Sequence, residues 1–270
     1  MVVIEDSQLR HRTVATPDGA RLAVQESGPA DAPALLLLQG QANSHDWWTG
    51  LRDDFARDFR TITFDYRGTG ATQAAEYDVD WSTGLFATDA RCVLDALGVH
   101  RACVYGTSMG GRVAQMLASS APARVERLVL ACTSPGGALA HERSSEVRRA
   151  LAQPDEGVRV RALLDLMYTP AWFDRHRRSH LLGDPGMTGR ARTLHLRVSA
   201  RHDAADRLPQ VVAPTLVLHG DADLMSPVAN AHLIAERVPD CRVVVVPGGR
   251  HGFFDEFREA VSADVRRFLA

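Results

Sequence analysis

The sequence predicts an α/β protein built on a mostly parallel sheet, and three observations support this prediction. Short apolar runs without a polar residue, such as residues 34–38, are typical of strands that helices cover on both faces. Between such runs, as in residues 82–97, apolar residues recur at helical spacing. The runs and the helical patterns alternate along most of the chain, which indicates parallel strands joined by right-handed crossovers.

Each element in the first half of the chain has its own local signal. Residues 12–27 alternate apolar and polar side chains around Pro17-Asp18-Gly19, which predicts a hairpin of two edge strands. Further strands follow from apolar runs, and helices follow from helical spacing. The strands are expected at residues 34–38, 61–64, 102–105 and 125–131, and the helices at about 46–57, at 82–97 and directly after residue 108.

The alternation is interrupted between residues 134 and 208. This stretch is rich in arginine, has helical spacing, contains several glycines and prolines, and has no clear strand pattern. The sequence therefore predicts one core, residues 1–133 and 209–270, with a helical insertion at 134–208 that lies over the sheet. After the insertion the alternation returns, with strands expected at 215–219 and 242–246 and helices at 228–237 and 254–269.

The composition is that of an ordinary globular protein and excludes several kinds of chemistry. Of 270 residues, 45% are apolar and 24% are charged, and the formal net charge is -2. We therefore expect no binding to nucleic acid or to an anionic membrane. All 31 basic residues are arginine, which excludes a Schiff-base lysine and a P-loop lysine. No apolar run approaches the roughly 18 residues that span a bilayer.

The N-terminus and the cysteines both favour the cytoplasm. The first residues lack the basic start and the long apolar run of a signal peptide. The four cysteines are scattered, without metal-ligand spacing, and are expected to be buried free thiols in a reducing compartment. No cluster of histidines and carboxylates predicts a metal site, and residues 106–111 lack the glycine spacing of a dinucleotide site. We therefore expect no metal and no cofactor. The cysteines are Cys92, Cys103, Cys132 and Cys241.

Ser108 is the predicted nucleophile, because it lies where an expected strand turns sharply into a helix. It stands in Gly106-Thr-Ser108-Met-Gly110, directly after the apolar run 102–105. A residue at the apex of such a turn has a strained backbone and an exposed side chain, and its neighbours two positions away must be almost free of side chain. The N-terminus of the following helix offers N–H groups to an anion.

Two further loops carry the partners that a serine nucleophile needs. A serine hydroxyl needs a base to remove its proton, and imidazole, with a pKa of about 6.5, is suited to this. His251 lies in a glycine-rich loop after the last expected strand, and Asp223 follows the strand at 215–219. Such loops meet at the carboxyl ends of a parallel sheet. We therefore predict that His251 is the base and that Asp223 orients it, whereas Asp221, the alternative acid, supports its turn.

Two backbone N–H groups are predicted to bind the oxyanion that forms during the reaction. Met109 directly follows the nucleophile, and Gln41 lies in the polar glycine loop after the strand at 34–38. The loss of one such donor typically costs about 3 kcal/mol or more.

These motifs, in the chain order serine, aspartate and histidine, resemble those of the α/β-hydrolase family from about residue 12 to the C-terminus. Within that family, the chain is similar to small cofactor-free esterases, enol-lactonases and haloperoxidase-like enzymes with a helical cap, and its loop at 39–48 is similar to that of methylesterases. The resemblance implies a mostly parallel eight-stranded sheet flanked by helices, with residues 134–208 as the cap. It is carried by Gly106-Thr-Ser108-Met-Gly110, Gly220-x-x-Asp223, Gly249-x-His251-Gly252 and Asp65-x-Arg67-Gly-x-Gly70.

One position departs from the family pattern. His-Gly commonly precedes the oxyanion donor, whereas this chain has Gln39-Gly40. Since the donor is a backbone N–H, we expect the site to persist with a different side chain orienting the loop.

Other residues have a structural and a functional interpretation. Arg67 is interpreted as a structural residue that pairs with a carboxylate, with a functional role as the alternative. His219 is expected to be packed at the end of a strand. Aromatic and sulfur-containing side chains could line an apolar substrate pocket, although ordinary packing is the simpler explanation for each alone. The pocket candidates are Trp47, Trp48, Met167, Tyr168, Trp172 and Phe173, and the histidines expected on the surface are His100, His176, His202 and His232.

We therefore predict a cytoplasmic serine hydrolase that transfers the acyl group of a small or medium, moderately apolar ester or lactone to Ser108. The same fold and triad also serve C–C bond cleavage, peracid formation and ring closure, so a lyase, perhydrolase or cyclase is the alternative. A ligand-binding receptor is a third interpretation, but binding needs neither nucleophile nor base. The expected partner is a small-molecule substrate, and a cap of this kind can support a homodimer.

Overall fold

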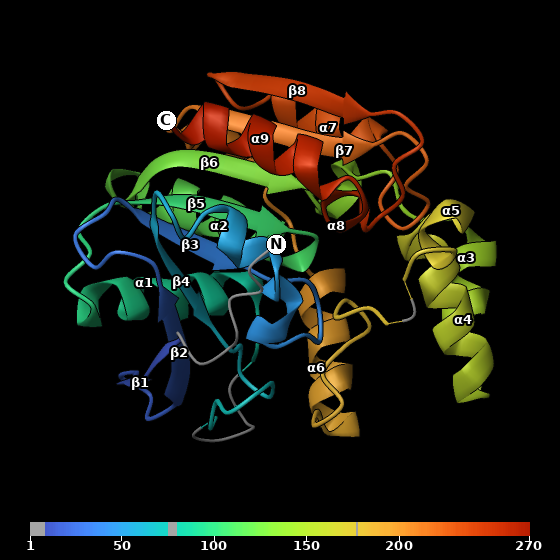
Figure 1. Cartoon of the computed structure of the whole chain (residues 1–270), viewed down its shortest axis with the longest axis horizontal. Coiled ribbons are helices and arrows are strands. Elements are labelled where there is room, and N and C mark those ends of the chain that lie inside the picture. Colours follow the sequence, from blue (N-terminus) through green and yellow to red (C-terminus); the bar gives the residue numbers. More distant parts are fainter. Residues whose placement is uncertain (1–8, 75–79, 177) are drawn as a thin grey trace.

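The computed structural model describes residues 9–74, 80–176 and 178–270, and a sheet of eight strands runs through its centre (Figure 1). The strand order is β1-β2-β4-β3-β5-β6-β7-β8. From β4 to β8 all neighbours are parallel, whereas β1, β2 and β4 pair antiparallel. The mostly parallel eight-stranded sheet is thereby confirmed. The bounds are β1 Arg10–Ala15, β2 Arg21–Ser27, β3 Ala34–Leu38, β4 Arg60–Phe64, β5 Ala102–Thr107, β6 Val125–Ala131, β7 Thr215–Gly220 and β8 Cys241–Val246.

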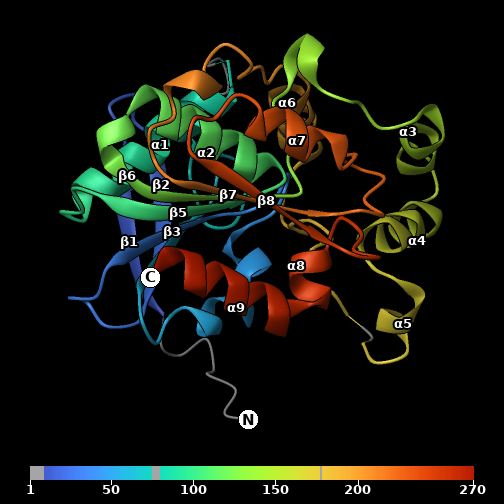
Figure 2. The ribbon, with the colours of Figure 1, turned by 90° about the horizontal axis from the view of Figure 1, so that it is seen from above.

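Helices cover both faces of the sheet, which explains why the central strand β3 is apolar at every position (Figure 2). In β3, Leu36 and Leu38 belong to the core on the side of α1, α2 and α7, whereas Leu35 and Leu37 belong to the core on the side of α9. Successive strand residues point to opposite faces of the sheet, so the residues on both faces of β3 must be apolar. The bounds are α1 Thr83–Ala96, α2 Met109–Ser120, α7 Ala229–Ala235 and α9 Arg258–Leu269.

The chain between β6 and β7, residues 132–214, is called the β6–β7 segment below. Its described residues form helices and one isolated bridge between Gly136 and Asp203. Three of the helices begin at a side-chain cap, because Ser144, Asp155 and Thr188 each accept from the N–H three residues further on. In both ribbon views α3, α4 and α5 lie beyond the end of the sheet where β7 and β8 finish (Figures 1 and 2). The bounds are α3 Ser145–Leu151, α4 Glu156–Met167, α5 Pro170–Phe173 and α6 Gly189–Ala200.

One predicted helix is wrong in type and length. Residues 46–57 form two short 3-10 helices, His45–Trp48 and Leu51–Asp54, instead of one α-helix. Thr49 has a ψ of 127° and Gly50 has a φ of 76°, so the backbone leaves the helical region between them. The loop that carries the candidate oxyanion donor is therefore followed by a tight, irregular connection.

The helix predicted at 254–269 is divided in two. α8 (Phe253–Glu256) and α9 are separated at Phe257, where φ is -102° and ψ is 34°. Among the residues that the structure describes, further short 3-10 helices are Pro122–Arg124, Gly137–Leu139 and Leu208–Gln210.

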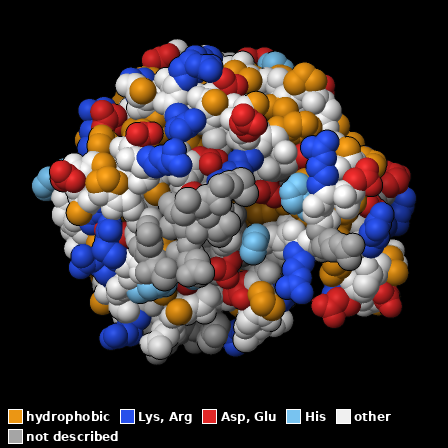
Figure 3. All heavy atoms as spheres, viewed as in Figure 1, with side chains coloured by type: hydrophobic (Ala, Val, Ile, Leu, Met, Phe, Trp, Pro, Cys, Tyr) orange, Lys and Arg blue, Asp and Glu red, His pale blue; other side chains and the backbone are white. Residues whose placement is uncertain are grey.

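The surface mixes charges of both signs. Acidic and basic side chains lie next to one another across the face seen in Figure 3. None of the helices in the described ranges has the length and apolar character needed to cross a membrane.

Candidate active site

Ser108 lies at the apex of the turn from β5 into α2, and its backbone is strained. Its φ is 52° and its ψ is -118°, a region that residues other than glycine rarely adopt. The flanking glycines are required by space, because a Cβ on Gly110 would overlap the Leu38 carbonyl and one on Gly106 would overlap Gly110. The Ser108 N–H donates to the Ala131 carbonyl at 2.9 Å, which ties the turn to β6.

The loops after β5, β7 and β8 bring Ser108, Asp223 and His251 together. His251 Nδ1 lies 2.7 Å from Asp223 Oδ2, and His251 Nε2 lies 3.0 Å from Ser108 Oγ. These strands and β6 pair in parallel, so their carboxyl ends finish at the same edge of the sheet. The three side chains therefore form a continuous chain of hydrogen bonds.

The Asp223 carboxylate is buried and hydrogen-bonded through both oxygens. Its Oδ1 accepts from the N–H groups of Met225 at 2.8 Å and Ser226 at 2.9 Å. Burial alone would raise the pKa of this carboxyl, but the interactions with His251 and His219 outweigh burial. The pKa of Asp223 therefore lies well below its ordinary value, and the group is ionised throughout the neutral range.

This environment defines the tautomer of neutral His251. An ionised carboxylate only accepts hydrogen bonds, so Nδ1 carries the proton and donates to Asp223. Nε2 is then the acceptor that faces the Ser108 hydroxyl. His251 is 3% exposed, which limits competition from water. The geometry allows the imidazole to take a proton from Ser108 while the carboxylate stabilises the imidazolium.

His219 is packed at the end of β7, as the sequence predicts, and it also contacts Asp223. Its Nε2 donates to the Ser226 carbonyl at 2.7 Å and lies 3.4 Å from Asp223 Oδ2. Its Nδ1 has no hydrogen-bond partner among the described residues. The contact between His219 and Asp223 could have been predicted from the sequence, because His219 lies at a strand end only four residues before Asp223.

Gln41 and Met109 lie in neighbouring loops. Gln41 follows β3, Met109 is the first residue of α2, and β3 pairs with β5 so that Leu38 is opposite Gly106. Within the described ranges, neither the Gln41 N–H nor the Met109 N–H donates to another residue. Both N–H groups therefore have no acceptor among the described residues, and their binding of an oxyanion stays a prediction.

Gln39, which departs from the family pattern, fastens the start of this loop to β4. Its side chain is fully buried, and its Nε2 donates to the Phe64 carbonyl at 2.8 Å. One side-chain N–H is enough for this contact, so glutamine can hold the loop where the family commonly has histidine.

The C-terminal end of α4 holds the loop that carries His251. The His251 N–H donates to the Leu166 carbonyl at 3.2 Å, and the Gly252 N–H donates to the Met167 carbonyl at 2.8 Å. The β6–β7 segment therefore fixes the backbone from which the imidazole extends.

Most side chains predicted to line a substrate pocket lie in the core on the α9 side of the sheet. Trp48 is completely buried against Tyr105 and Phe254. Trp47 donates from Nε1 to Thr107 Oγ1 at 2.9 Å. Core packing is thus established for these two residues, and contact with a substrate stays a prediction. Trp47, Trp48, Met167, Tyr168 and Trp172 are at most 5% exposed, and Phe173 is half-buried.

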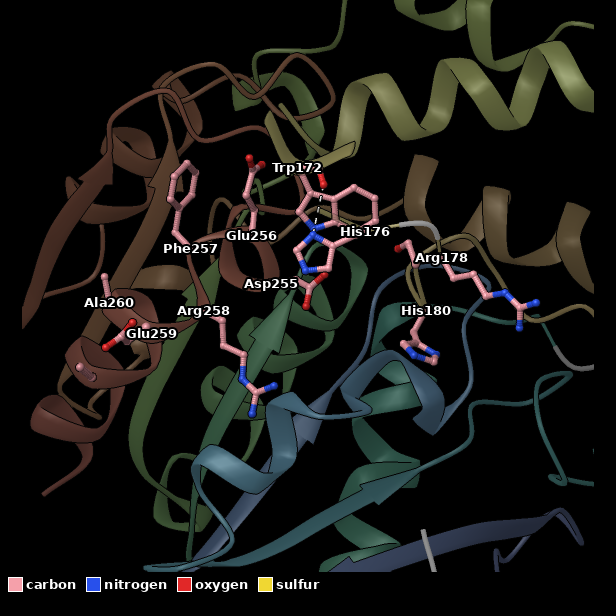
Figure 4. A pocket seen from close by; sticks show the side chains of 12 residues that line it. Trp172, His176, Arg178, His180, Asp255, Glu256, Phe257, Arg258, Glu259 and Ala260 are labelled. Carbon is pink, nitrogen blue, oxygen red and sulfur yellow. Dashed lines mark hydrogen bonds between the residues drawn. The ribbon is translucent and has the colours of Figure 1, made fainter. Parts of the chain in front are cut away.

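A cavity of about 890 Å³ opens beside α5, α8 and α9 (Figure 4). Trp172 and His176, whose rings stack with centroids 4.7 Å apart, line one side of it. Asp255, Glu256 and Arg258 line it from α8 and α9. None of its lining residues belongs to the hydrogen-bonded chain of Ser108, so the cavity is distinct from that site.

Arg67 and Asp221 have the structural roles predicted for them. Arg67 is buried and pairs with Asp89 at 2.7 Å and with Asp18 at 2.5 Å. Asp221 accepts from the Gly248 N–H at 2.7 Å, which supports its turn.

The prediction that His202 lies on the surface is wrong. The residue is 2% exposed, and its Nδ1 lies 3.0 Å from Thr83 Oγ1 at the start of α1. The residue follows α6, whose polar sequence concealed this contact. The other histidines expected on the surface, His100, His176 and His232, are exposed.

All four cysteines are free thiols, as predicted. Burial is confirmed for Cys103 and Cys132, whereas Cys92 and Cys241 are only partly buried because each packs at the edge of the core. In the ranges that the structure describes, no group of three or more His, Cys, Asp or Glu side chains is arranged to hold a metal ion.

A family model described as the alpha/beta hydrolase fold matches residues 33–257. The chain belongs to this family. The match includes the loops after β3, β5, β7 and β8, which carry every residue of the candidate site. The resemblance inferred from the motifs is thereby confirmed.

Proteins similar to this α/β-hydrolase span most of its length. RutD from Variovorax paradoxus (strain S110), provisionally named a carbamate hydrolase, is 32% identical over 83% of this chain and 86% of its own. A non-heme chloroperoxidase from Burkholderia pyrrocinia is 29% identical over 95% of this chain and 98% of its own. The crystal structure of the esterase RhEst1 from Rhodococcus sp. ECU1013 has a TM-score of 0.80 and 26% identity, over 97% of this chain and 98% of that one. The chain is a hydrolase of this fold, with esterases among its relatives.

Proposed function

We propose that this α/β-hydrolase is a serine hydrolase that forms an acyl-enzyme on Ser108. The observation that carries the proposal is the hydrogen-bonded order of Asp223, His251 and Ser108, with distances of 2.7 and 3.0 Å. Nucleophile, base and orienting acid within hydrogen-bond reach are typical of an activated serine. A binding protein would need none of these contacts.

In the proposed mechanism, Ser108 Oγ attacks the carbonyl carbon of the substrate. His251 Nε2 takes the hydroxyl proton, and the ionised Asp223 stabilises the imidazolium. His251 then gives this proton to the leaving alkoxide oxygen. In the second half, His251 takes a proton from water, the water oxygen attacks the acyl carbon, and Ser108 is released with its proton restored.

We propose that the N–H groups of Gln41 and Met109 bind the oxyanion in both halves of the reaction. Support comes from their position on neighbouring loops and from the absence of another acceptor for either group among the described residues. Charge develops on the carbonyl oxygen only during the reaction, so such donors lower the barrier more than they strengthen substrate binding.

The proposed substrate is a small or medium, moderately apolar ester or lactone, with residues 134–208 acting as a cap. The similarity to the esterase RhEst1 supports the ester class. The contacts between α4 and the His251 loop support a cap that lies next to the site. A carbamate, which the name of RutD indicates, has a carbonyl open to the same attack and belongs in the substrate screen.

A second candidate function is peracid formation, which the chloroperoxidase relative favours. Hydrogen peroxide would replace water in the second half, so the acyl-enzyme would release a peracid. Assaying acetate ester turnover with and without peroxide, with peracid detection, separates the two functions.

The first test is labelling with a fluorophosphonate probe and mapping of the modified peptide, with turnover of short-chain nitrophenyl esters measured alongside. We expect the label on Ser108. Ser108→Ala should lose labelling and turnover while the far-ultraviolet circular dichroism stays unchanged. Ser120→Ala, at the exposed end of α2, is the matched control and should keep both the labelling and the ester turnover. Turnover that survives in Ser108→Ala contradicts the proposal.

A further inference from the structure

The loop that carries Gln41 is held by the β6–β7 segment as well as by the sheet. Ala42, the next residue, has a φ of 58°, a conformation that residues with a side chain rarely adopt. Both of its backbone polar groups bind that segment. Its N–H donates to His195 Nδ1 at 3.2 Å, and its carbonyl accepts from the Asp184 N–H at 2.7 Å.

The peptide group between Gln41 and Ala42 is consequently fixed at both ends. The Gln41 carbonyl accepts from Asn43 Nδ2 at 2.8 Å, and the Ala42 N–H is bound to His195. Asn43 is itself oriented by the β6–β7 segment, because its Oδ1 accepts from the Gly183 N–H at 2.9 Å. A peptide group held at its oxygen and at its nitrogen cannot rotate, and this limits the orientation of Gln41.

His195 is suited to this task because its partners allow only one tautomer. A backbone N–H can only donate, so Nδ1 is the acceptor for Ala42, and Nε2 carries the proton that it donates to the Arg67 carbonyl at 2.9 Å. The side chain is fully buried near the rings of Trp81 and Phe86. Burial lowers its pKa to about 4, against a smaller opposing effect of the bond to Arg67, so the ring is neutral at ordinary pH.

We infer that His195 is a positioning residue of the oxyanion site, which holds the Gln41 N–H in the direction needed to bind the oxyanion. This inference rests on the proposed serine hydrolase mechanism. His195 touches no reacting atom. Its effect is exerted through Ala42, and it makes the β6–β7 segment part of the catalytic arrangement.

His195→Phe tests the inference, since it keeps a buried ring and removes both hydrogen bonds. A misplacement of about 1 Å can slow a reaction by about 100-fold, so we expect kcat per fluorophosphonate-labelled site to fall by about 10- to 100-fold while KM changes by less than about threefold. His195→Asn returns an acceptor oxygen close to the position of Nδ1 and should recover most of the lost kcat. A residue that only fills space would not be rescued in this way.

His202→Phe is the matched control. His202 is also a buried histidine of the β6–β7 segment, but it contacts α1 and not the Gln41 loop. We expect it to lower the melting temperature without lowering kcat per labelled site. An unchanged kcat in His195→Phe, or an equal fall in both variants, overturns the inference.

Amide hydrogen exchange of residues 39–43 provides a readout that needs no turnover. Exchange in this peptide should be at least about tenfold faster in His195→Phe than in the wild type and unchanged in His202→Phe, because only the first variant frees the Ala42 N–H. Wild-type protein that is neither labelled nor active would contradict the proposed function. Unchanged exchange in His195→Phe would contradict the positioning role separately.

Discussion

Replacing Asp223 with asparagine should change the tautomer of His251 while leaving the shape of the site almost intact. The amide oxygen can still accept from Met225 and Ser226, which now donate to Oδ1 at 2.8 and 2.9 Å. The amide nitrogen then takes the place of Oδ2, which lies 2.7 Å from His251 Nδ1. An amide nitrogen can only donate a hydrogen bond. Nδ1 therefore becomes the acceptor, and Nε2 carries the proton toward Ser108 and can no longer act as the base.

The size of the effect follows from the charge pair that is lost. The Asp223 and His251 side chains are at most 4% exposed, so the carboxylate stabilises the imidazolium with little screening. With an effective dielectric constant of about 20, unit charges about 4 Å apart attract by about 4 kcal/mol, which is roughly 10³-fold in rate. The wrong tautomer adds to this loss, and a serine triad in that state is slowed by about 10⁴-fold. We therefore expect kcat to fall by about 10³- to 10⁴-fold.

The assay is steady-state turnover of a nitrophenyl ester, with circular dichroism as the check on folding. Asp221→Asn is the matched control, because Asp221 lies two residues away and only supports the turn at Gly248. Its kcat should change by no more than about twofold, as for other surface substitutions. Asp223→Asn with kcat within tenfold of the wild type would refute the reasoning, and a large loss in Asp221→Asn would reassign the acid.

Asp223→Asn should also change the pH dependence of stability. The folded-state pKa of Asp223 lies below its unfolded value of about 3.9. As the pH falls, the unfolded chain therefore takes up a proton at this residue before the folded chain does. The stabilisation from this carboxylate is therefore complete above about pH 4 to 5 and is lost as the pH falls through the folded-state pKa. Denaturant unfolding between pH 3 and 7 should give a shallower pH dependence in the variant. Equal slopes would contradict the lowered pKa.

Two further predictions concern stability. Gly110→Ala places a Cβ against the Leu38 carbonyl and should lower the free energy of unfolding by about 1–3 kcal/mol or more. Urea unfolding measures this loss, and an unchanged urea midpoint would mean that the turn tolerates a side chain. Arg67→Met leaves Asp89, 1% exposed, without its guanidinium partner and should cost about 3–5 kcal/mol. Adding Asp89→Asn to Arg67→Met should recover part of that loss, and no recovery would show that packing of Arg67, not its charge, is what matters.

The features that the sequence predicted well are those with a local physical cause. A strand buried on both faces must be apolar throughout, and residues 34–38 are. The turn at Ser108 excludes a Cβ on Gly106 and Gly110, and the sequence displays this as flanking glycines. Asp223 and His251 could be located because strand ends in a parallel sheet converge.

The features that it missed depend on partners far away in the chain. At the break within residues 46–57, the Gly50 carbonyl accepts from Arg258, 208 residues further on, at 2.6 Å, a contact that the apolar spacing does not reveal. His202 and His195 lie in a polar, arginine-rich stretch, and their burial depends on contacts with Thr83 and Ala42, more than 100 residues away. No local pattern records such contacts, so the bracing of the Gln41 loop emerged only from the structure.

The distance along the chain between the candidate catalytic residues has a consequence during synthesis. Ser108 and His251 are 143 residues apart, and ribosomes add about 5–20 residues per second, so the histidine is made about 7 to 30 s after the serine. Ala42 waits longer still for His195, which is 153 residues further on. A nascent chain that stops short of residue 251 therefore carries a serine without its base, and the hydrogen-bonded site can form only after His251 has been added.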